Sequence, residues 1–412
     1  MSLVERLVPA RLGTPFRWLL GGFWTAQLGD GIALAAGPLL VASQTDSAVL
    51  VGLAAALQRV PWLVFGLHAG AIADRLDRKR VTIAMDAVRV LVLLVLCGFI
   101  VTGWVNVGVV LVAMFLIGVA EVFADSASST LLPMLVQKAD LGVANARTMS
   151  DHLVLNQLAG APVGAFLFGV GMAVPFGAQA LCMALALVLI ARVATPPSPR
   201  SSIDTHVGRD IREGLVWLWQ HGAVRTLALT ILLFNVTWGA AWGVLVLYST
   251  ELLGMSAVGF GLMTTMTAIG GLISTFSYDW IERKFPLSLV MKTCLVLEVV
   301  MHLVLAVNRS QAVALVVMLF FGAYAFVWGT LSNAVRQRVT PAEFQGRIGS
   351  VYRVGLFGGL VIGQVLGGVI ADVWGLTGPY WFAFVGSAVV LAAFWSQLNL
   401  IVHADEEAAA EG

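Results

Sequence analysis

The sequence has few charged residues. Only 11% of its 412 residues are Asp, Glu, Lys or Arg, whereas 59% are hydrophobic. A soluble domain carries about 25% charged residues, because its surface must face water. A chain of this length with so little charge cannot cover a water-facing surface. We therefore exclude a soluble globular protein and expect an outer surface that faces lipid.

Other residue types are scarce or scattered, and this excludes further classes of protein. The three cysteines, Cys97, Cys182 and Cys294, lie inside apolar runs and resemble small buried hydrophobic residues, not disulfides or ligands. The six histidines form no cluster, so we expect no metal site. A net charge of +1 gives no attraction to nucleic acid. No Lys follows a Gly, so the nucleotide-binding phosphate loop is absent. We expect no cofactor.

Long apolar runs occupy most of the chain, and the mean hydropathy is +0.90. A helix needs about 20 apolar residues to cross the hydrocarbon core. Continuous runs favour helices over the alternating strands of a barrel. We predict an all-α polytopic membrane protein with twelve transmembrane helices. The predicted spans are residues 16–42, 48–72, 81–102, 107–132, 147–170, 172–194, 224–248, 256–278, 287–307, 312–335, 348–372 and 376–400.

The charges in the loops predict the orientation. Lys and Arg gather in the N-terminus and the even-numbered loops, and the odd-numbered loops hold only Arg309. Positive charge marks the cytoplasmic side. The first residues show no cleavage site, so we interpret them as a cytoplasmic lead-in, not a signal peptide. We predict a multi-pass cell (inner) membrane protein with both termini cytoplasmic.

The longest polar stretch, residues 195–223, separates six spans from six. It begins with Pro and Ser and then becomes amphipathic, which predicts a short helix at the cytoplasmic interface. We predict an N-terminal six-helix bundle over 1–194, this linker, a C-terminal bundle over 224–402 and an acidic tail over 403–412.

Loop sequences on the two sides of the linker are alike. DRLDRKR from Asp74 corresponds to DWIERKF from Asp279, and KADLGVANAR ending at Arg147 corresponds to RVTPAEFQGR ending at Arg347. Corresponding loops in matching order indicate a duplicated half. In many secondary transporters such halves rock about a central cavity.

The loop after the second span resembles a signature of the major facilitator superfamily. GAIADRLDRKR, from Gly70 to Arg80, matches the signature except that Asp77 replaces its second Gly. We expect a left-handed backbone at Asp77, since Asp tolerates it better than most residues. The resemblance implies the superfamily's fold, with two pseudo-symmetric six-helix bundles.

The same resemblance implies a cytoplasmic latch between the halves. It places in the latch the residues Gly70, Asp74, Arg75, Arg78 and the acidic Asp125. Two other interpretations remain open: Asp74 caps a helix N-terminus, or the Arg residues only keep the loop inside.

Further segments resemble one branch of the superfamily. LAGAPVGAF, with Gly160, Pro162 and Gly164, is similar to its antiporter motif, which is associated with exporters. AQLGDGIALAAGPLL, IREGLVWLWQHGAVRTL and FQGRIGSVYR are similar to enterobactin exporters and macrolide or multidrug efflux pumps. The branch implies a monomeric, non-enzymatic secondary transporter that exports small amphipathic molecules, such as drugs or siderophore-like metabolites, by alternating access. We expect proton antiport.

Charged residues inside spans cost about 2.5–3.5 kcal/mol each, so each needs an explanation. Asp30 and Arg59 lie near the middle of their spans, and Glu121 lies just past the middle of its own. An intramembrane carboxylate such as Asp30 or Glu121 can carry a proton between the two sides of the membrane. The alternative is a fixed ion pair, such as Asp30 with Arg59.

Other polar residues in spans have two interpretations. Glu298 and His302 are four residues apart and share a helix face, suited either to proton handling or to packing on a neighbour. Asp86 and Arg89 are candidates to join the latch.

A surface rich in aromatic and small polar groups suits bulky, partly apolar ligands. Trp238 and Trp242 are one turn apart, as are Tyr324 and Trp328, so each pair shares a face. Contact with lipid or neighbouring helices is the alternative. The candidate substrate residues are Trp24, Gln27, Asn156, Asn235, Trp238, Trp242, Tyr324 and Trp328.

Two other functions remain open. An importer or uniporter on the same fold would use Asp30 to bind a substrate amine or to form a fixed pair. A membrane enzyme would need a nucleophile with a base, and a receptor would not transport; the repeat and the lack of such a constellation argue against both. The expected partners are a small-molecule substrate, protons and the lipid bilayer.

Overall fold

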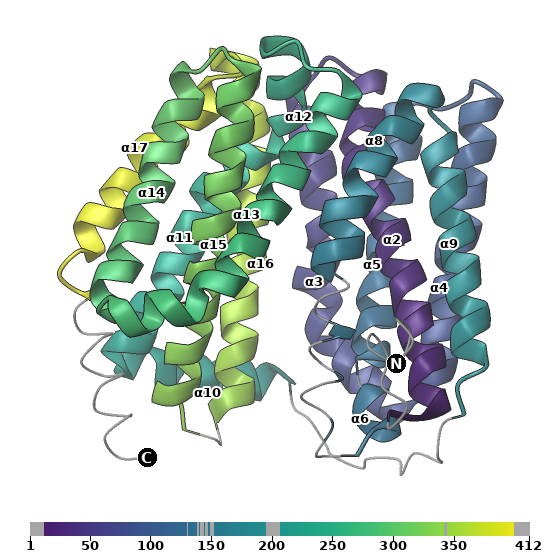
Figure 1. The fold of residues 1–412 in the computed structure, drawn as a ribbon, viewed down its shortest axis with the longest axis horizontal. Helices are drawn as coiled ribbons and strands as arrows, with labels where there is room; N and C mark the ends of the chain where they lie inside the picture. Colours follow the sequence, from purple (N-terminus) through teal and green to yellow (C-terminus); the bar gives the residue numbers. More distant parts are fainter. Residues whose placement is uncertain are drawn as a thin grey trace. The chain divides into compact units, whose positions relative to one another are not determined.

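The computed structural model is helical in every regular element that it describes (Figure 1). It describes residues 12–129, 131–137, 140, 144, 147–148, 152–194, 207–341 and 344–398. The helices up to residue 191 are α2 (Gly13–Gln44), α3 (Ala48–Arg75), α4 (Arg78–Val101), α5 (Val107–Ser128), α6 (Leu132–Leu135), η3 (His152–Gly160), α8 (Ala161–Val170) and α9 (Val174–Ala191).

The later helices follow the same pattern of long apolar segments joined by short loops. They are α10 (Val207–Gln220), α11 (Gly222–Gly243), α12 (Leu245–Leu247), η4 (Tyr248–Leu252), α13 (Ala257–Lys284), α14 (Leu287–Val307), α15 (Gln311–Val339), α16 (Gln345–Trp374) and α17 (Gly378–Phe394). The stretches η3 and η4 are π-helical, a geometry that is uncommon and frequent at functional sites.

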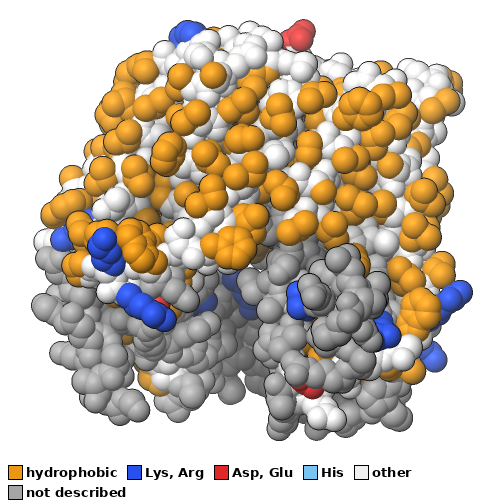
Figure 2. Space-filling view, viewed as in Figure 1, with side chains coloured by type: hydrophobic (Ala, Val, Ile, Leu, Met, Phe, Trp, Pro, Cys, Tyr) orange, Lys and Arg blue, Asp and Glu red, His pale blue; other side chains and the backbone are white. Residues whose placement is uncertain are grey.

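Ten of the described helices are long and apolar enough to cross a membrane. Two shorter apolar helices, Val154–Val170 and Gly378–Phe394, lie at the fifth and twelfth predicted spans. Large hydrophobic side chains are exposed on the helices, including Leu91, Leu181 and Phe276, and hydrophobic side chains are spread across the described surface on the face in Figure 2. The all-helical membrane fold is confirmed, while the count of twelve spans stays a prediction.

The helices group into two compact units. The first consists of Met1–Gln44, Val64–Asp204 and Phe260–Thr265, and the second of Thr45–Leu63, Thr205–Gly259 and Met266–Gly412. The first part of α3 therefore packs with the second unit, and a short piece of α13 packs with the first. The two bundles that the sequence divides at 195–223 stay a prediction.

In the first unit, glycines allow α2 to contact η3 and α8 through the backbone. A Cβ on Gly160 would lie 2.6 Å from the Cα of Gly31, and a Cβ on Gly164 would overlap the carbonyl oxygen of Ile32. Small residues permit such close approach of helices in membranes. The glycines of the antiporter-like motif therefore form the contact with the segment of α2 that carries Asp30. Pro162 is the second residue of α8 and lies in its first turn, where the absence of its N–H costs least.

In the second unit, a stripe of small residues joins α16 to α11. Added Cβ atoms on three glycines of α16 would meet main-chain atoms of α11; these are Gly359, Gly363 and Gly367. Their spacing of four residues places them on one helix face. The start of α3 uses another face of α16, where Gly52 lies against the backbone of Gly368. Glycine is abundant in this helix because two neighbours approach it closely.

Asp77 does not have the left-handed backbone that we expected. Its φ of −66° and ψ of 106° are extended, and no described residue other than Gly has a positive φ. Asp77 is the N-cap of α4, and its side chain accepts a hydrogen bond from the backbone N–H of Arg80 at 3.1 Å. An N-cap residue requires extended dihedrals, and Asp is among the residues that fill this position best.

Candidate functional site

Asp30 lies in a segment of α2 that is held on two sides. A Cβ on Gly29 would lie 2.9 Å from Cys182 of α9, and Gly31 lies directly against the main chain of Asn156 in η3. The backbone of α2 therefore lies close to α9 on one side and to η3 on another. This close packing fixes the position from which the Asp30 carboxylate extends toward α4.

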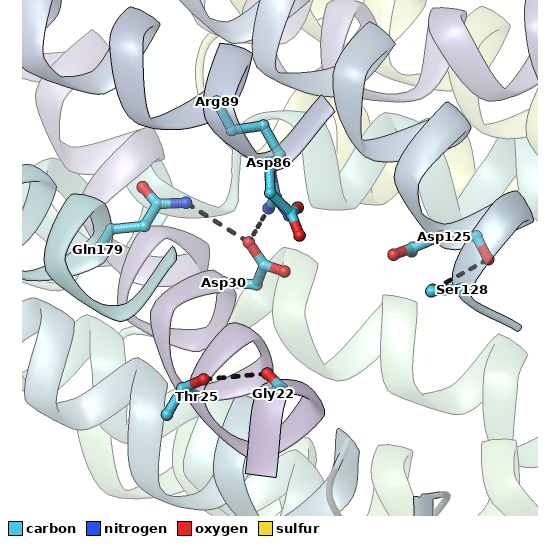
Figure 3. Close-up of polar contacts among 8 residues, drawn as sticks. All are labelled: Gly22, Thr25, Asp30, Asp86, Arg89, Asp125, Ser128 and Gln179. Carbon is cyan, nitrogen blue, oxygen red and sulfur yellow. Dashed lines mark hydrogen bonds and ion pairs between the residues drawn. The ribbon is translucent and has the colours of Figure 1, made fainter. Parts of the chain in front are cut away.

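Asp30 forms an ion pair with Arg89 of α4. The guanidinium is buried, with Nη2 donating to Asp30 Oδ1 and Nη1 lying 3.6 Å from Asp86 Oδ1, one turn earlier in α4 (Figure 3). Gln179 of α9 donates from Nε2 to the same Oδ1 of Asp30 at 3.5 Å. α2, α4 and α9 therefore meet at one carboxylate.

This ion pair replaces the one that the sequence suggested. Arg59, the expected partner of Asp30, lies in the part of α3 that belongs to the second unit. Arg89, which was a candidate to join the latch, is the basic residue that pairs with Asp30. Loop spacing and sequence distance do not reveal which helices are neighbours; here α2 packs against α9, η3 and α8, and Asp30 reaches Arg89 of α4.

Arg89 interacts electrostatically with four carboxylates: those of Asp30, Asp86, Glu121 and Asp125. We call these five residues the acid cluster. In Figure 3 the Asp125 carboxylate extends from α5 toward the side where Asp30 and Asp86 lie. One guanidinium can neutralise one carboxylate, and an uncompensated charge away from water is costly. Among these five residues four are acidic and one is basic, and a proton is one means of neutralising an acid group.

A cavity of about 280 Å³ adjoins the acid cluster. Three acidic side chains line it, those of Asp30, Asp86 and Asp125. The same walls carry the basic Arg89 and the uncharged polar residues Gln27 and Thr148. The side chain of Asp30 keeps 22% of its surface exposed, whereas Arg89 keeps 2%. A proton or a small cationic group in the cavity can therefore reach Asp30, while Arg89 stays buried behind it.

The latch residues lie only partly within the described structure. The surroundings of Gly70, Asp74 and Arg75, at the end of α3, lie outside it. Arg78 at the start of α4 contacts Met134 Sδ through Nη1 at 3.3 Å. Asp125 lines the cavity of the acid cluster. The latch stays a prediction.

The basic loop also stabilises a helix end. Lys79 donates from Nζ to the backbone oxygens of Ala191 and Val193, at 2.7 and 2.8 Å. These carbonyls lie at the C-terminal end of α9, where a positive charge is favourable. Part of the positive charge in this loop therefore holds α9 in place.

The aromatic candidates of the second unit contact one another. The ring centroids of Trp238 and Trp242 are 5.0 Å apart on α11, and both rings pack against Phe321 of α15, at 5.7 and 6.1 Å. Phe321 continues to Tyr324 in an edge contact. The shared face predicted for Trp238 and Trp242 is confirmed, and it joins α11 to α15. Phe321 was missed because isolated phenylalanines are common in spans.

The remaining candidates have packing contacts. Trp24 packs against the apolar core at the start of α2, and within the described part of the chain its buried Nε1 has no hydrogen-bond partner. Asn156 is buried, Asn235 donates to the carbonyl oxygen of Ile231 at 2.6 Å, and Trp328 is half-buried on α15. Their role in binding substrate stays a prediction.

Gln179 is a site residue that the sequence interpretation missed. It is buried near the start of α9 and reaches Asp30. The signal was present, because Gln179 is the one residue of VPFGAQALCMALALVLIA with a side-chain amide. A polar group within an apolar span needs a partner.

Comparison with known proteins agrees with this architecture. The multidrug efflux pump Tap of Mycolicibacterium fortuitum is 29% identical over 88% of this chain and 90% of its own length. The macrolide efflux protein A of Streptococcus pyogenes is 21% identical over 90% and 94%. The crystal structure of a bacterial homologue of the iron transporter ferroportin covers 97% of this chain and 100% of its own, with a TM-score of 0.76 and 14% identity.

The family model described as transmembrane secretion effector matches residues 7–411, which is nearly the whole chain. The resemblance to the major facilitator superfamily and its efflux branch is thereby confirmed. This chain therefore belongs to the transmembrane secretion effector family of major facilitator membrane transporters.

Proposed function

We propose that this protein is a proton-coupled exporter of small amphipathic molecules, such as drugs or siderophore-like metabolites. It works as a monomer in the cell (inner) membrane, with both termini cytoplasmic, by alternating access. One observation carries the proposal: four carboxylates interact electrostatically with one buried guanidinium, and Asp30 and Asp86 lie against it beside a cavity. A proton carrier needs a carboxylate that is reachable, intramembrane and able to exist in both charge states.

Asp30 fits this role better than the other acids of the acid cluster. Protonation removes its charge and breaks its ion pair with Arg89. The guanidinium then turns to Asp86, which already lies 3.6 Å away. One proton therefore redistributes charge among α2, α4 and α5, and this change can favour one transport state over another.

Two further observations support export of amphipathic molecules. The efflux proteins similar to this chain are named for multiple drugs and for macrolides. The cluster of Trp238, Trp242 and Phe321 offers the flat apolar surface that such molecules bind. The positive charge of the even-numbered loops supports cytoplasmic termini.

The proposal predicts the direction and the energy source of transport. Inverted membrane vesicles expose the cytoplasmic face, so an exporter should load a fluorescent amphipathic dye into them when their interior is acidified. A protonophore should abolish the loading, because it removes the gradient. Vesicles without the protein are the control. Loading that persists with the protonophore would reject proton coupling, and dye leaving preloaded vesicles down the proton gradient would favour an importer.

An importer or uniporter is the second candidate. The Asp30–Arg89 pair is the observation that favours it, because a permanent pair would hold α2 against α4 without exchanging protons. Equal transport at all proton gradients would support this alternative.

A further inference from the structure

A second group of buried titratable residues lies in the other unit, on α14 and α15. His302 Nε2 lies 3.1 Å from Glu298 Oε1, one turn earlier in α14. Tyr324 of α15 donates its hydroxyl to the other oxygen, Glu298 Oε2, at 2.6 Å. His302 is fully buried, and Glu298 and Tyr324 are buried as well. Both carboxylate oxygens therefore have partners on the same two helices.

The hydrogen bonds indicate which protonation states are possible. Glu298 Oε2 accepts from Tyr324, and Oε1 accepts when His302 carries its hydrogen on Nε2; with that tautomer both oxygens accept, which is the pattern of an ionised carboxylate. His302 Nδ1 is buried and has no hydrogen-bond partner among the residues that the structure describes. With His302 neutral, the group carries one buried negative charge. One added proton gives either a charged His302 beside an ionised Glu298 or a neutral His302 beside a protonated Glu298. Neither state has a net charge.

Among the described residues, no ion pair joins Glu298 or His302 to a charged side chain of a neighbouring helix. α14 packs against α15 and α17. Between Gly378 and Phe394, α17 carries no charged residue, and its one titratable side chain is Tyr380. α15 contributes Tyr324, and η4 contributes Tyr248, whose hydroxyl donates to the Leu305 carbonyl.

α14 itself carries two further titratable groups near this pair. Cys294 interacts electrostatically with Glu298. Lys292 lies with its Nζ 5.0 Å from the ring centroid of Trp395. Among the described residues, His302 is the basic side chain that forms an ion pair with Glu298.

We propose that Glu298 and His302 form a second proton-binding site, which takes up and releases one proton as a unit. Tyr324 is its positioning residue. The Tyr324 ring also lines an apolar pocket of about 350 Å³ between α13, α14 and α15. The proton at Glu298 is therefore separated from this pocket by one side chain. The use of this site in transport rests on the proposed function, whereas proton binding does not.

Proton uptake by the purified full-length protein tests this site directly. The protein in detergent is shifted from about pH 8 to about pH 5, the range in which histidine titrates, and a pH indicator reports the protons bound. Glu298→Gln and His302→Gln should each bind about one proton fewer than wild type. The double variant should also bind about one fewer, not two, because the pair titrates together. Glu251→Gln, which removes an exposed acid of the same unit, should match wild type.

The outcomes separate this proposal from the proposed function. Unchanged uptake in His302→Gln or in Glu298→Gln would overturn the site, because the proton would then bind without the pair. His302→Asn provides a second variant at that position for the case that His302→Gln does not fold. If the variants bind one proton fewer but the wild-type protein loads no dye into vesicles, the proton-binding site stands and export is rejected. If the wild-type protein loads dye but the variants bind as many protons as wild type, export stands and the site is rejected.

Discussion

Replacing Arg89 with methionine should lower the free energy of unfolding by about 3–5 kcal/mol, the cost of removing one partner of a buried ion pair. Methionine keeps most of the volume and none of the charge. Four carboxylates then lose the guanidinium that they share. The loss should be smaller at acidic pH, since protonation neutralises the carboxylates left without a counter-charge. Reversible unfolding of the purified protein in mixed detergents measures the effect.

A second substitution tests whether Asp30 is the main partner. Arg89→Met combined with Asp30→Asn should recover part of the loss, with a coupling energy of about 0.5–3 kcal/mol, because the residues are in direct contact. Arg80→Met is the matched control: Arg80 is exposed on α4, and its ion pair with Asp77 lies at the surface. It should change stability by at most about 1 kcal/mol. Additive effects of the Arg89 and Asp30 substitutions would contradict the pairing.

Gly164→Ala should destabilise the protein by about 1–3 kcal/mol, although alanine is the better helix former. The added Cβ would overlap the main-chain oxygen of Ile32, and backbone atoms cannot move aside as a flexible side chain can. Ile32 is two residues from Asp30, so we also expect weaker proton-driven transport. Thermal unfolding and dye loading measure the two effects.

Gly169→Ala on the same helix is the control for Gly164→Ala. A Cβ on Gly169 has nothing within 4 Å, so the helix propensity of alanine should stabilise the protein by about 0.5–1 kcal/mol. The two substitutions are chemically identical, and only the neighbouring backbone differs. Equal effects would show that the contact between α8 and α2 does not decide stability.

Composition and periodicity predicted the features of the fold that depend on the lipid surroundings. Apolar length placed the long helices, because crossing lipid requires an uninterrupted apolar run. One-turn spacing predicted that Trp238 and Trp242 share a face, which the structure confirms. The position of Asp30 within its span identified it as a residue that needs a partner, and the structure supplies Arg89 and Gln179.

The sequence did not predict which helices are neighbours. Asp30 is paired with Arg89 and not with Arg59, because α2 packs against α9, η3 and α8 and presents Asp30 to α4. Charge type and depth are similar for both arginines, so no local signal separates them. Asp77 was assigned a left-handed backbone by analogy with glycine, but the start of α4 requires an N-cap there. Tertiary contacts and capping decided these points.

Tyr324 shows the same limit in the second unit. Its spacing from Trp328 suggested a ligand-binding face, yet its hydroxyl donates to Glu298 of α14. A tyrosine in a span needs a partner for its hydroxyl, and sequence spacing within α15 cannot identify a partner on another helix.

The most direct test of the account compares wild type with Asp30→Asn in inverted vesicles, at equal protein levels. Asparagine keeps the shape of the side chain but carries no proton. We predict that wild type loads the dye when the vesicle interior is acid. Asp30→Asn should lose this loading and still exchange labelled dye for unlabelled dye across the membrane. Full proton-driven loading by Asp30→Asn would contradict the account, because Asp30 would then not carry the proton.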